Sequence, residues 1–210
     1  NRVFRSHQSM IRHLALFLLL LSLTSANSLS ELDRRLSASL EGSNQLPLLD
    51  ISLEAFALTT PAVEWGWVFH QWQTNNSLKQ YDLYKIGAFS LLTTYAAAGT
   101  VKYFIRRERP ERKYQPRLWN SRITPSFPSG HVAASSAWAT VAAHHFPESA
   151  PLLISYVILS VWSQVYVGNH YLSDAVAGTL LGWMMGRFAL DKMGTNSAKA
   201  SPYIQFSFSL

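Results

Sequence analysis

The sequence predicts an all-α protein, a compact bundle of about five to six helices. Its apolar segments have helical spacing, and no repeated strand pattern interrupts them. Of the 210 residues, 48% are apolar and 13% aromatic, which suffices for the core of one domain. Charged residues make up only 14%, below the quarter or so typical of soluble domains. This favours contact with a membrane, although the mean hydropathy of +0.04 is low for a chain made mostly of spanning helices.

Residues 1–26 have the pattern of a secretory signal peptide. Three arginines precede an apolar run from Leu14 to Leu23, and small residues follow as far as Ala26. The run is short for a membrane span, and an uncleaved anchor helix is the alternative. Removing the leader lowers the formal net charge from +6 to +3, so the basicity is partly a targeting feature. We find no nucleic-acid-binding module, and the absence of cysteine excludes disulfides and thiol chemistry.

The rest of the chain is predicted to form one domain. Its consecutive parts are a helical part at 27–82, a catalytic core at 83–191 and a C-terminal tail at 192–210. In the first part, Leu32, Leu36 and Leu40 recur at four-residue spacing. That spacing predicts a short amphipathic helix that lies on the domain or on a membrane surface.

Four helices are expected in the core. They begin at Ile86, His131, Ala150 and Tyr171, and they end before Pro110 and near Phe146, Gly168 and Leu190. The third contains 19 residues without a charge and is the best transmembrane candidate after the leader. In the fourth, Gly178, Gly182 and Gly186 are spaced by four residues, which lets a neighbouring helix approach closely.

Two polar clusters interrupt this apolar background. On a helix, Lys102, Arg106 and Arg109 would project from one face and form an anion site, although such a cluster is commonly a solvated face. In the second cluster, Pro128, Ser129, Gly130 and His131 predict a turn followed by a helix start. The free N–H groups of a helix start favour an anion, and the alternative is an ordinary N-cap at Ser129.

A third cluster pairs a histidine with a carboxylate. His170 and Asp174 are four residues apart, so on a helix the carboxylate can hold one ring nitrogen and leave the other for a substrate. Such a pair can do nucleophilic or acid–base chemistry, and a surface ion pair is the alternative. The loop at 111–127 carries four further cations, which either recruit anionic head groups or form a solvated connection.

The order of these clusters resembles the three-part signature of the type 2 phosphatidic acid phosphatase (PAP2) superfamily, which also includes class A acid phosphatases and vanadium haloperoxidases. The matching runs are Lys-x6-Arg-Pro, Pro-Ser-Gly-His and Ser-x6-His-x3-Asp. The resemblance implies that His170 attacks phosphorus and becomes a phosphohistidine, that Asp174 orients it, and that His131 protonates the leaving oxygen. It also implies a phosphate-binding set, which comprises Lys102, Arg109, Ser129 and the Gly130 amide.

The sequence departs from the family pattern at one position. The third motif usually opens Ser-Arg, whereas here Gln164 follows Ser163. An amide at this substrate-binding position can donate a hydrogen bond but cannot form a bidentate charged pair. We therefore expect weaker stabilisation of the transition state unless Arg106 or Arg107 compensates.

The expected function is hydrolysis of a phosphomonoester or pyrophosphate, preferably of a lipid, without a metal or other cofactor. The expected location is the cell envelope, in or on the membrane with the site facing the periplasm. A soluble periplasmic acid phosphatase of broad specificity is one alternative. A weakly active or inactive phospholipid-binding relative is another because of Gln164, and a vanadate-dependent oxidant is a third.

Overall fold

The computed structural model describes residues 27–74 and 78–193, and this part of the chain is helical without strands. The predicted signal peptide (residues 1–26) and the predicted tail beyond residue 193 lie outside the described residues. The α-helices are α2 (Asn27–Leu40), α3 (Pro47–Gln73), α4 (Leu78–Ile105), α5 (Gly130–His145), α6 (Ala150–Tyr166) and α7 (Leu172–Met193), with a 3₁₀ turn at Pro147–Ser149. The predicted all-α bundle of five to six helices is confirmed.

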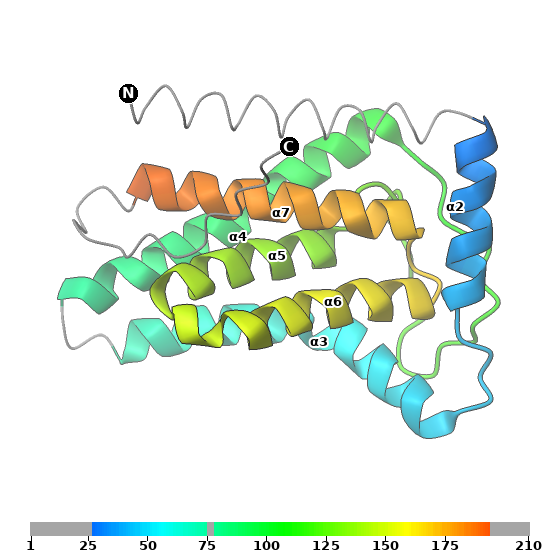
Figure 1. The fold of residues 1–210 in the computed structure, drawn as a ribbon, viewed down its shortest axis with the longest axis horizontal. Coiled ribbons are helices and arrows are strands. Elements are labelled where there is room, and N and C mark those ends of the chain that lie inside the picture. Colours follow the sequence, from blue (N-terminus) through cyan, green and yellow to red (C-terminus); the bar gives the residue numbers. More distant parts are fainter. Residues whose placement is uncertain (1–26, 75–77, 194–210) are drawn as a thin grey trace, which may run out of the picture.

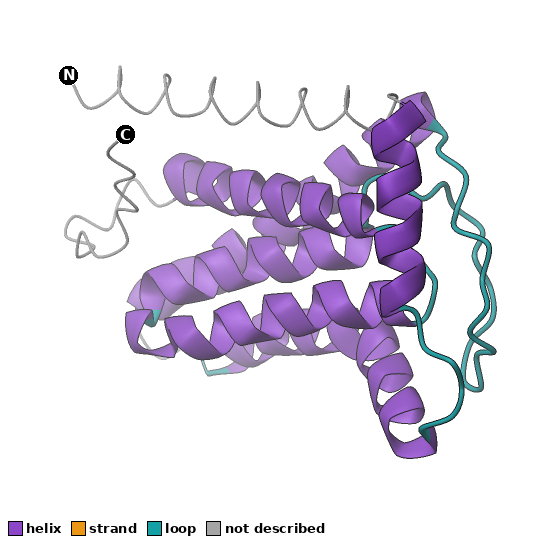
Figure 2. Cartoon of the chain, turned by 45° about the vertical axis from the view of Figure 1, so that its right-hand side comes forward, coloured by secondary structure: helices purple, strands orange, loops and turns teal. Residues whose placement is uncertain are grey.

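Helices α3 to α7 lie side by side, and α2 crosses one end of the bundle (Figure 1). At that end α4 and α6 finish, and α5 and α7 begin. The long connection between α4 and α5 runs over the same end, beside α2 (Figure 2). Residues from all three predicted polar clusters are thereby brought to one end of the molecule.

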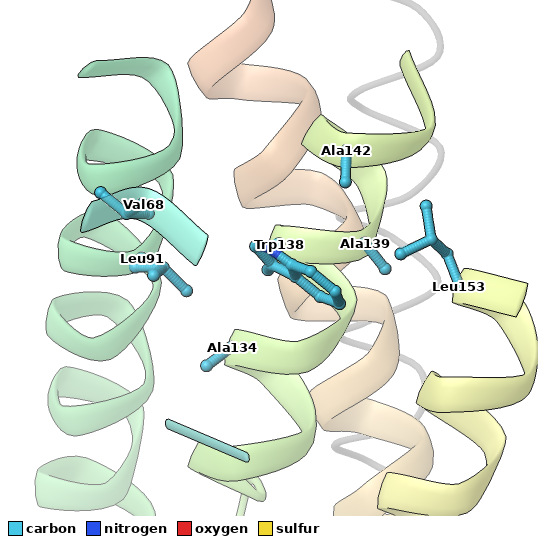
Figure 3. Packing of buried hydrophobic residues seen from close by; sticks show 7 residues of the cluster. All are labelled: Val68, Leu91, Ala134, Trp138, Ala139, Ala142 and Leu153. Carbon is cyan, nitrogen blue, oxygen red and sulfur yellow. The ribbon is translucent and has the colours of Figure 1, made fainter. Parts of the chain in front are cut away.

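Helix α5 is the centre of the bundle. Trp138 of α5 lies in a buried cluster with Leu91 of α4, Val68 of α3 and Leu153 of α6 (Figure 3). The alanine-rich sequence of α5 gives its other face small side chains. Helix α7 therefore packs directly on the backbone of α5. A packed core around one central helix is the layered arrangement expected for a helical domain.

The glycine stripe of α7 has the role that its spacing predicted. A Cβ added at Gly178 would lie 2.6 Å from the carbonyl oxygen of Ser129, and one at Gly186 would lie 2.8 Å from that of Ala137. At Gly182 it would overlap the Ala133 carbonyl group. Each glycine therefore faces the backbone of α5. The two helices can approach so closely only because these positions have no side chain.

The predicted end of α4 is wrong. The helix finishes at Ile105, five residues before Pro110, because Arg106 adopts a left-handed backbone conformation with φ = 49°. Lys102, Arg106 and Arg109 therefore do not share a helix face. Arg106 turns back, donates to the Tyr103 carbonyl and lies over the Tyr103 ring.

One helix of the described chain is long and apolar enough to cross a membrane, namely the 3₁₀ turn and α6 taken together (Pro147–Tyr166). It overlaps the segment that the sequence singled out, Ala150 to Gly168. Large apolar side chains on its surface are exposed, among them Leu152, Ile154 and Ile158. The assignment of Pro147–Tyr166 as long and apolar enough to cross a membrane rests on its length and composition.

Candidate active site

The connection between α4 and α5 is held by carboxylates from α3 and from the segment after α2. Glu54 of α3 is 2% exposed and accepts hydrogen bonds from the backbone N–H groups of residues 117, 118 and 119. Glu41 accepts from the N–H groups of Lys113 and Tyr114. Three of the four loop cations are also engaged, since Arg117 pairs with Asp50 and both Arg112 and Arg122 reach inward. The loop is therefore an ordered wall of the site.

A cavity of about 150 Å³ lies at this end of the bundle. Four of the predicted site residues line it, namely Arg109, His131, Gln164 and His170. The two histidines come from different elements, since His131 lies in the first turn of α5 and His170 just before α7. The structure thus brings the two imidazoles to one cavity with a guanidinium beside them.

His170 is held so that its two ring nitrogens have different surroundings. Its Nδ1 lies 3.7 Å from Asp174 Oδ2 and 3.5 Å from Ser126 Oγ, and its Nε2 lies 3.5 Å from an Arg109 Nη1. A proton on Nδ1 faces the carboxylate, which leaves the Nε2 lone pair for the cavity. His170 lies just before α7, in line with the helix start predicted at Tyr171, so the pair spans the helix start and not a turn within the helix.

The charge state of His170 follows from its burial. Removal from water, together with the charges of Arg109 and Lys102, lowers the pKa of the imidazole to about 4, while Asp174 acts in the opposite direction. The imidazole is therefore neutral at pH 7. A neutral ring is the form that can attack an electrophile.

Asp174 is fully buried and has a dense set of donors. It accepts from Arg107 Nη1 at 2.6 Å, from Ser126 Oγ at 2.5 Å and from the Tyr171 N–H at 2.9 Å. Burial opposes its ionisation, but the interaction with His170 and the charge of Arg107 outweigh that effect and lower the pKa of the carboxyl. Arg107 also binds Asp33 of α2 at 2.7 Å. Helix α2 therefore helps to hold the guanidinium that binds Asp174.

The cations of the first motif reach the site from separate places. Arg109 Nη1 donates to the Asn169 carbonyl at 2.6 Å, and its Nε donates to the Thr124 carbonyl. Lys102 does not line the cavity, because its ammonium donates to the carbonyls of Pro125 and Ser126. It contributes a positive potential, which is part of the reason that the pKa values of both histidines are low.

The second motif forms the predicted start of α5. Helix α5 begins at Gly130, and Ser129 precedes it without making a side-chain cap. The Ser129 hydroxyl is buried and has no hydrogen-bond partner among the described residues. Burial, followed by the charges of Arg109 and Lys102, lowers the pKa of His131 to about 4. An incoming anion would oppose these charges and favour protonation of His131.

Gln164 is bound within the protein at both ends of its amide. Its Nε2 donates to the Ala57 carbonyl at 2.9 Å, and its Oε1 accepts from Asn169 at 3.0 Å. Pro61 lies inside α3 and has no N–H for the carbonyl four residues earlier, which is that of Ala57. Gln164 therefore satisfies an acceptor that the proline leaves open.

Sequence reasoning missed several groups around the site. Ser126 and Asn169 lie next to the motifs, whereas Asp33 and Glu54 come from helices that are distant in sequence. Only Asn169 had a usable signal, because it directly precedes His170. In the described part of the chain, no three His, Asp or Glu side chains are grouped as metal ligands would be.

Comparison with known proteins identifies the family. The model of the PAP2 superfamily matches residues 84–198, which is more than half of the chain. The chain belongs to the PAP2 superfamily. Decaprenylphosphoryl-5-phosphoribose phosphatase of Mycobacterium tuberculosis is 31% identical over 117 residues, which are 54% of this chain and 61% of that protein. The inositol phosphorylceramide synthase catalytic subunit of Saccharomyces cerevisiae is 33% identical over 69 residues, 33% of this chain and 17% of that protein. The matches thus span less than two thirds of these relatives.

Two solved structures have folds similar to that of this chain. A transmembrane PAP2 type phosphatidylglycerolphosphate phosphatase from Bacillus subtilis aligns with a TM-score of 0.71 and 17% identity. That alignment covers 90% of this chain and 98% of the other. LpxE of Aquifex aeolicus aligns with a TM-score of 0.60 and 22% identity over 75% of this chain and 93% of the other. At these identities the comparison establishes the helical fold.

Proposed function

We propose that the protein hydrolyses a phosphomonoester or pyrophosphate of a lipid through a phosphohistidine at His170. The observation that carries the proposal is the meeting of His131, His170 and Arg109 at one cavity. One imidazole can attack phosphorus, the other can protonate the departing oxygen, and the guanidinium can neutralise the phosphoryl charge.

The first step joins His170 Nε2 to phosphorus and breaks the ester P–O bond. The leaving oxygen takes a proton from His131, which becomes neutral. Asp174 lies 3.7 Å from Nδ1 and stabilises the positive charge that develops on the attacking ring. Because Asp174 also accepts from Arg107 and Ser126, the carboxylate stays in place and ionised.

The second step returns the enzyme to its starting state. Water attacks the phosphorus atom, the P–N bond breaks, and neutral His131 takes the proton of the water. Inorganic phosphate leaves with His170 neutral again. The same residue thus serves as acid and then as base, in agreement with microscopic reversibility.

A lipid substrate is favoured by the surface of the bundle. Large apolar side chains are exposed on α3, α4 and α6, among them Phe69, Leu92, Phe104 and Leu152. Exposed apolar surface of this extent is typical of proteins that contact a membrane. We therefore propose association with the membrane of the cell envelope, with the cavity end near the lipid head groups. A periplasmic orientation belongs to the same proposal.

The test measures phosphate release by purified full-length protein in detergent. Substrates are a long-chain lipid phosphate, a lipid pyrophosphate and a water-soluble phosphomonoester. We expect release that His170→Ala and His131→Ala abolish, with the lipids preferred. His144→Ala is the matched control, because this exposed histidine lies at the far end of α5. Preference for the soluble ester would indicate a broad acid phosphatase, and binding of lipid phosphate without release would indicate an inactive relative.

A further inference from the structure

We infer that Arg112 supplies the phosphate-binding guanidinium that the third motif lacks at Gln164. This inference rests on the proposed function and assigns a further binding residue to the same site. Arg112 belongs to none of the three motifs and lies in the connection between α4 and α5. It lines the cavity together with His131, Gln164 and His170.

Asn169 links Arg112 to Gln164, the position where the family motif usually has an arginine. The Asn169 side chain donates to Gln164 Oε1 at 3.0 Å, and its own oxygen accepts from Arg112 Nη2. The backbone carbonyl of Asn169 accepts from Arg109 at 2.6 Å. One residue, directly before His170, therefore holds two guanidinium groups at the cavity. A second guanidinium is what an arginine at position 164 would have provided.

Arg112 retains capacity to bind an anion. Its Nη1 donates to Asn120 Oδ1 at 2.9 Å, but its Nε is buried and has no partner among the described residues. A buried N–H without an acceptor is costly, and a phosphoryl oxygen in the cavity would satisfy it. Burial and the nearby charge of Arg122 lower the pKa of Arg112, and the negative charge of a bound anion would oppose both effects.

The position of Arg112 is built into the fold. The N–H groups of the next two residues, Lys113 and Tyr114, donate to the Glu41 carboxylate. Glycine at position 168 makes room for the side chain, because a Cβ there would lie 3.0 Å from Arg112 Cγ. The other cation of the loop that lines the cavity, Arg122, donates to the carbonyls of Pro110 and Gly168. We therefore assign loop closure to Arg122 and phosphate binding to Arg112.

The inferred role explains how Gln164 is compatible with activity. Gln164 satisfies the Ala57 carbonyl and orients Asn169, and Asn169 orients Arg112. The phosphate-binding charge is thus supplied by a neighbouring segment of chain, while position 164 has a structural role. Neither Arg106 nor Arg107 compensates, because neither lines this cavity and Arg107 is bound to Asp33 and Asp174.

The experiment measures binding of orthovanadate, which mimics the five-coordinate phosphorus of the reaction, to the full-length protein by calorimetry. We expect Arg112→Ala to weaken binding by about 10- to 100-fold. Arg112→Lys should give an intermediate loss, because it keeps the charge without the planar fork. Lys113→Ala, the exposed neighbour in the same loop, is the matched control and should bind as the unaltered protein does.

Two further comparisons make the assignment specific. Gln164→Arg should improve vanadate binding more in the Arg112→Ala background than alone, because the two guanidiniums would serve one function. Added guanidinium ions should partly restore binding to Arg112→Ala, which tests the same point without altering the buried position 164.

Unchanged binding in Arg112→Ala would overturn the inference. So would a larger loss in Arg122→Ala than in Arg112→Ala. Because vanadate binding requires no turnover, protein that binds vanadate through Arg112 but releases no phosphate would contradict the proposed function alone.

Discussion

Replacement of Gly182 by alanine tests the packing that brings α7 to the cavity end of α5. The added methyl would overlap the Ala133 carbonyl group, with the carbonyl carbon 2.8 Å away, where ordinary contact begins at 3.4 Å. A backbone carbonyl cannot rotate aside, so the helices must separate by more than half an ångström. Overpacking of this kind costs about 1–3 kcal/mol.

The matched control is Gly99→Ala in α4, where an added Cβ meets nothing within 4 Å. Both substitutions gain about 1 kcal/mol of helix propensity, so their difference isolates the clash at about 1–3 kcal/mol. For a chain of this size each kcal/mol shifts the unfolding temperature by about 2–4 °C, which separates the variants by roughly 2–12 °C. Thermal unfolding followed by tryptophan fluorescence measures this, and equal unfolding temperatures would refute the close helix contact.

Further predictions concern charge. His170 should contribute a fall of about 1 kcal/mol in the free energy of unfolding from pH 6 to pH 5, because the unfolded residue gains a proton near pH 6.5 while the buried one resists it down to about pH 4; thermal unfolding of His170→Gln should lack this share. The kcat/KM for a lipid phosphate should decrease above about pH 4 as His131 loses its proton, and an ester with a nitrophenol leaving group should lack this decrease. Arg107→Ala should lower the free energy of unfolding by about 3–5 kcal/mol, because fully buried Asp174 loses its charged partner. Denaturant titration should show a smaller loss for Asp33→Ala, since Asp33 is partly exposed.

The motifs selected several residues that meet at one cavity, but they did not predict the geometry around it. Spacing and family resemblance identified His131, His170 and Arg109, all of which line the cavity. They could not predict that α4 stops at Ile105, since a left-handed Arg106 has no local sequence signal. The early stop directs Arg107 and Arg109 to different partners, and a continuous helix would have kept both on fixed faces.

Contacts between distant segments were beyond sequence reasoning. Asp33 lies 140 residues from Ser173, and Glu54 organises a loop more than 60 residues away. Neither carboxylate belongs to a motif, so only the three-dimensional arrangement reveals its role. The bond from Gln164 to Ala57 is different, because Pro61 in α3 does predict an open carbonyl four residues earlier. That proline was the one overlooked signal for the function of position 164.

The central claim is that His170 carries the phosphoryl group during turnover. Its most direct test is to mix the protein with a substrate labelled at phosphorus, quench in alkali, which preserves phosphohistidine, and locate the label by peptide mass spectrometry. We expect the label on His170, with none in His170→Ala and an unchanged amount in His144→Ala. Label on another residue, or turnover retained by His170→Ala, would contradict the mechanism.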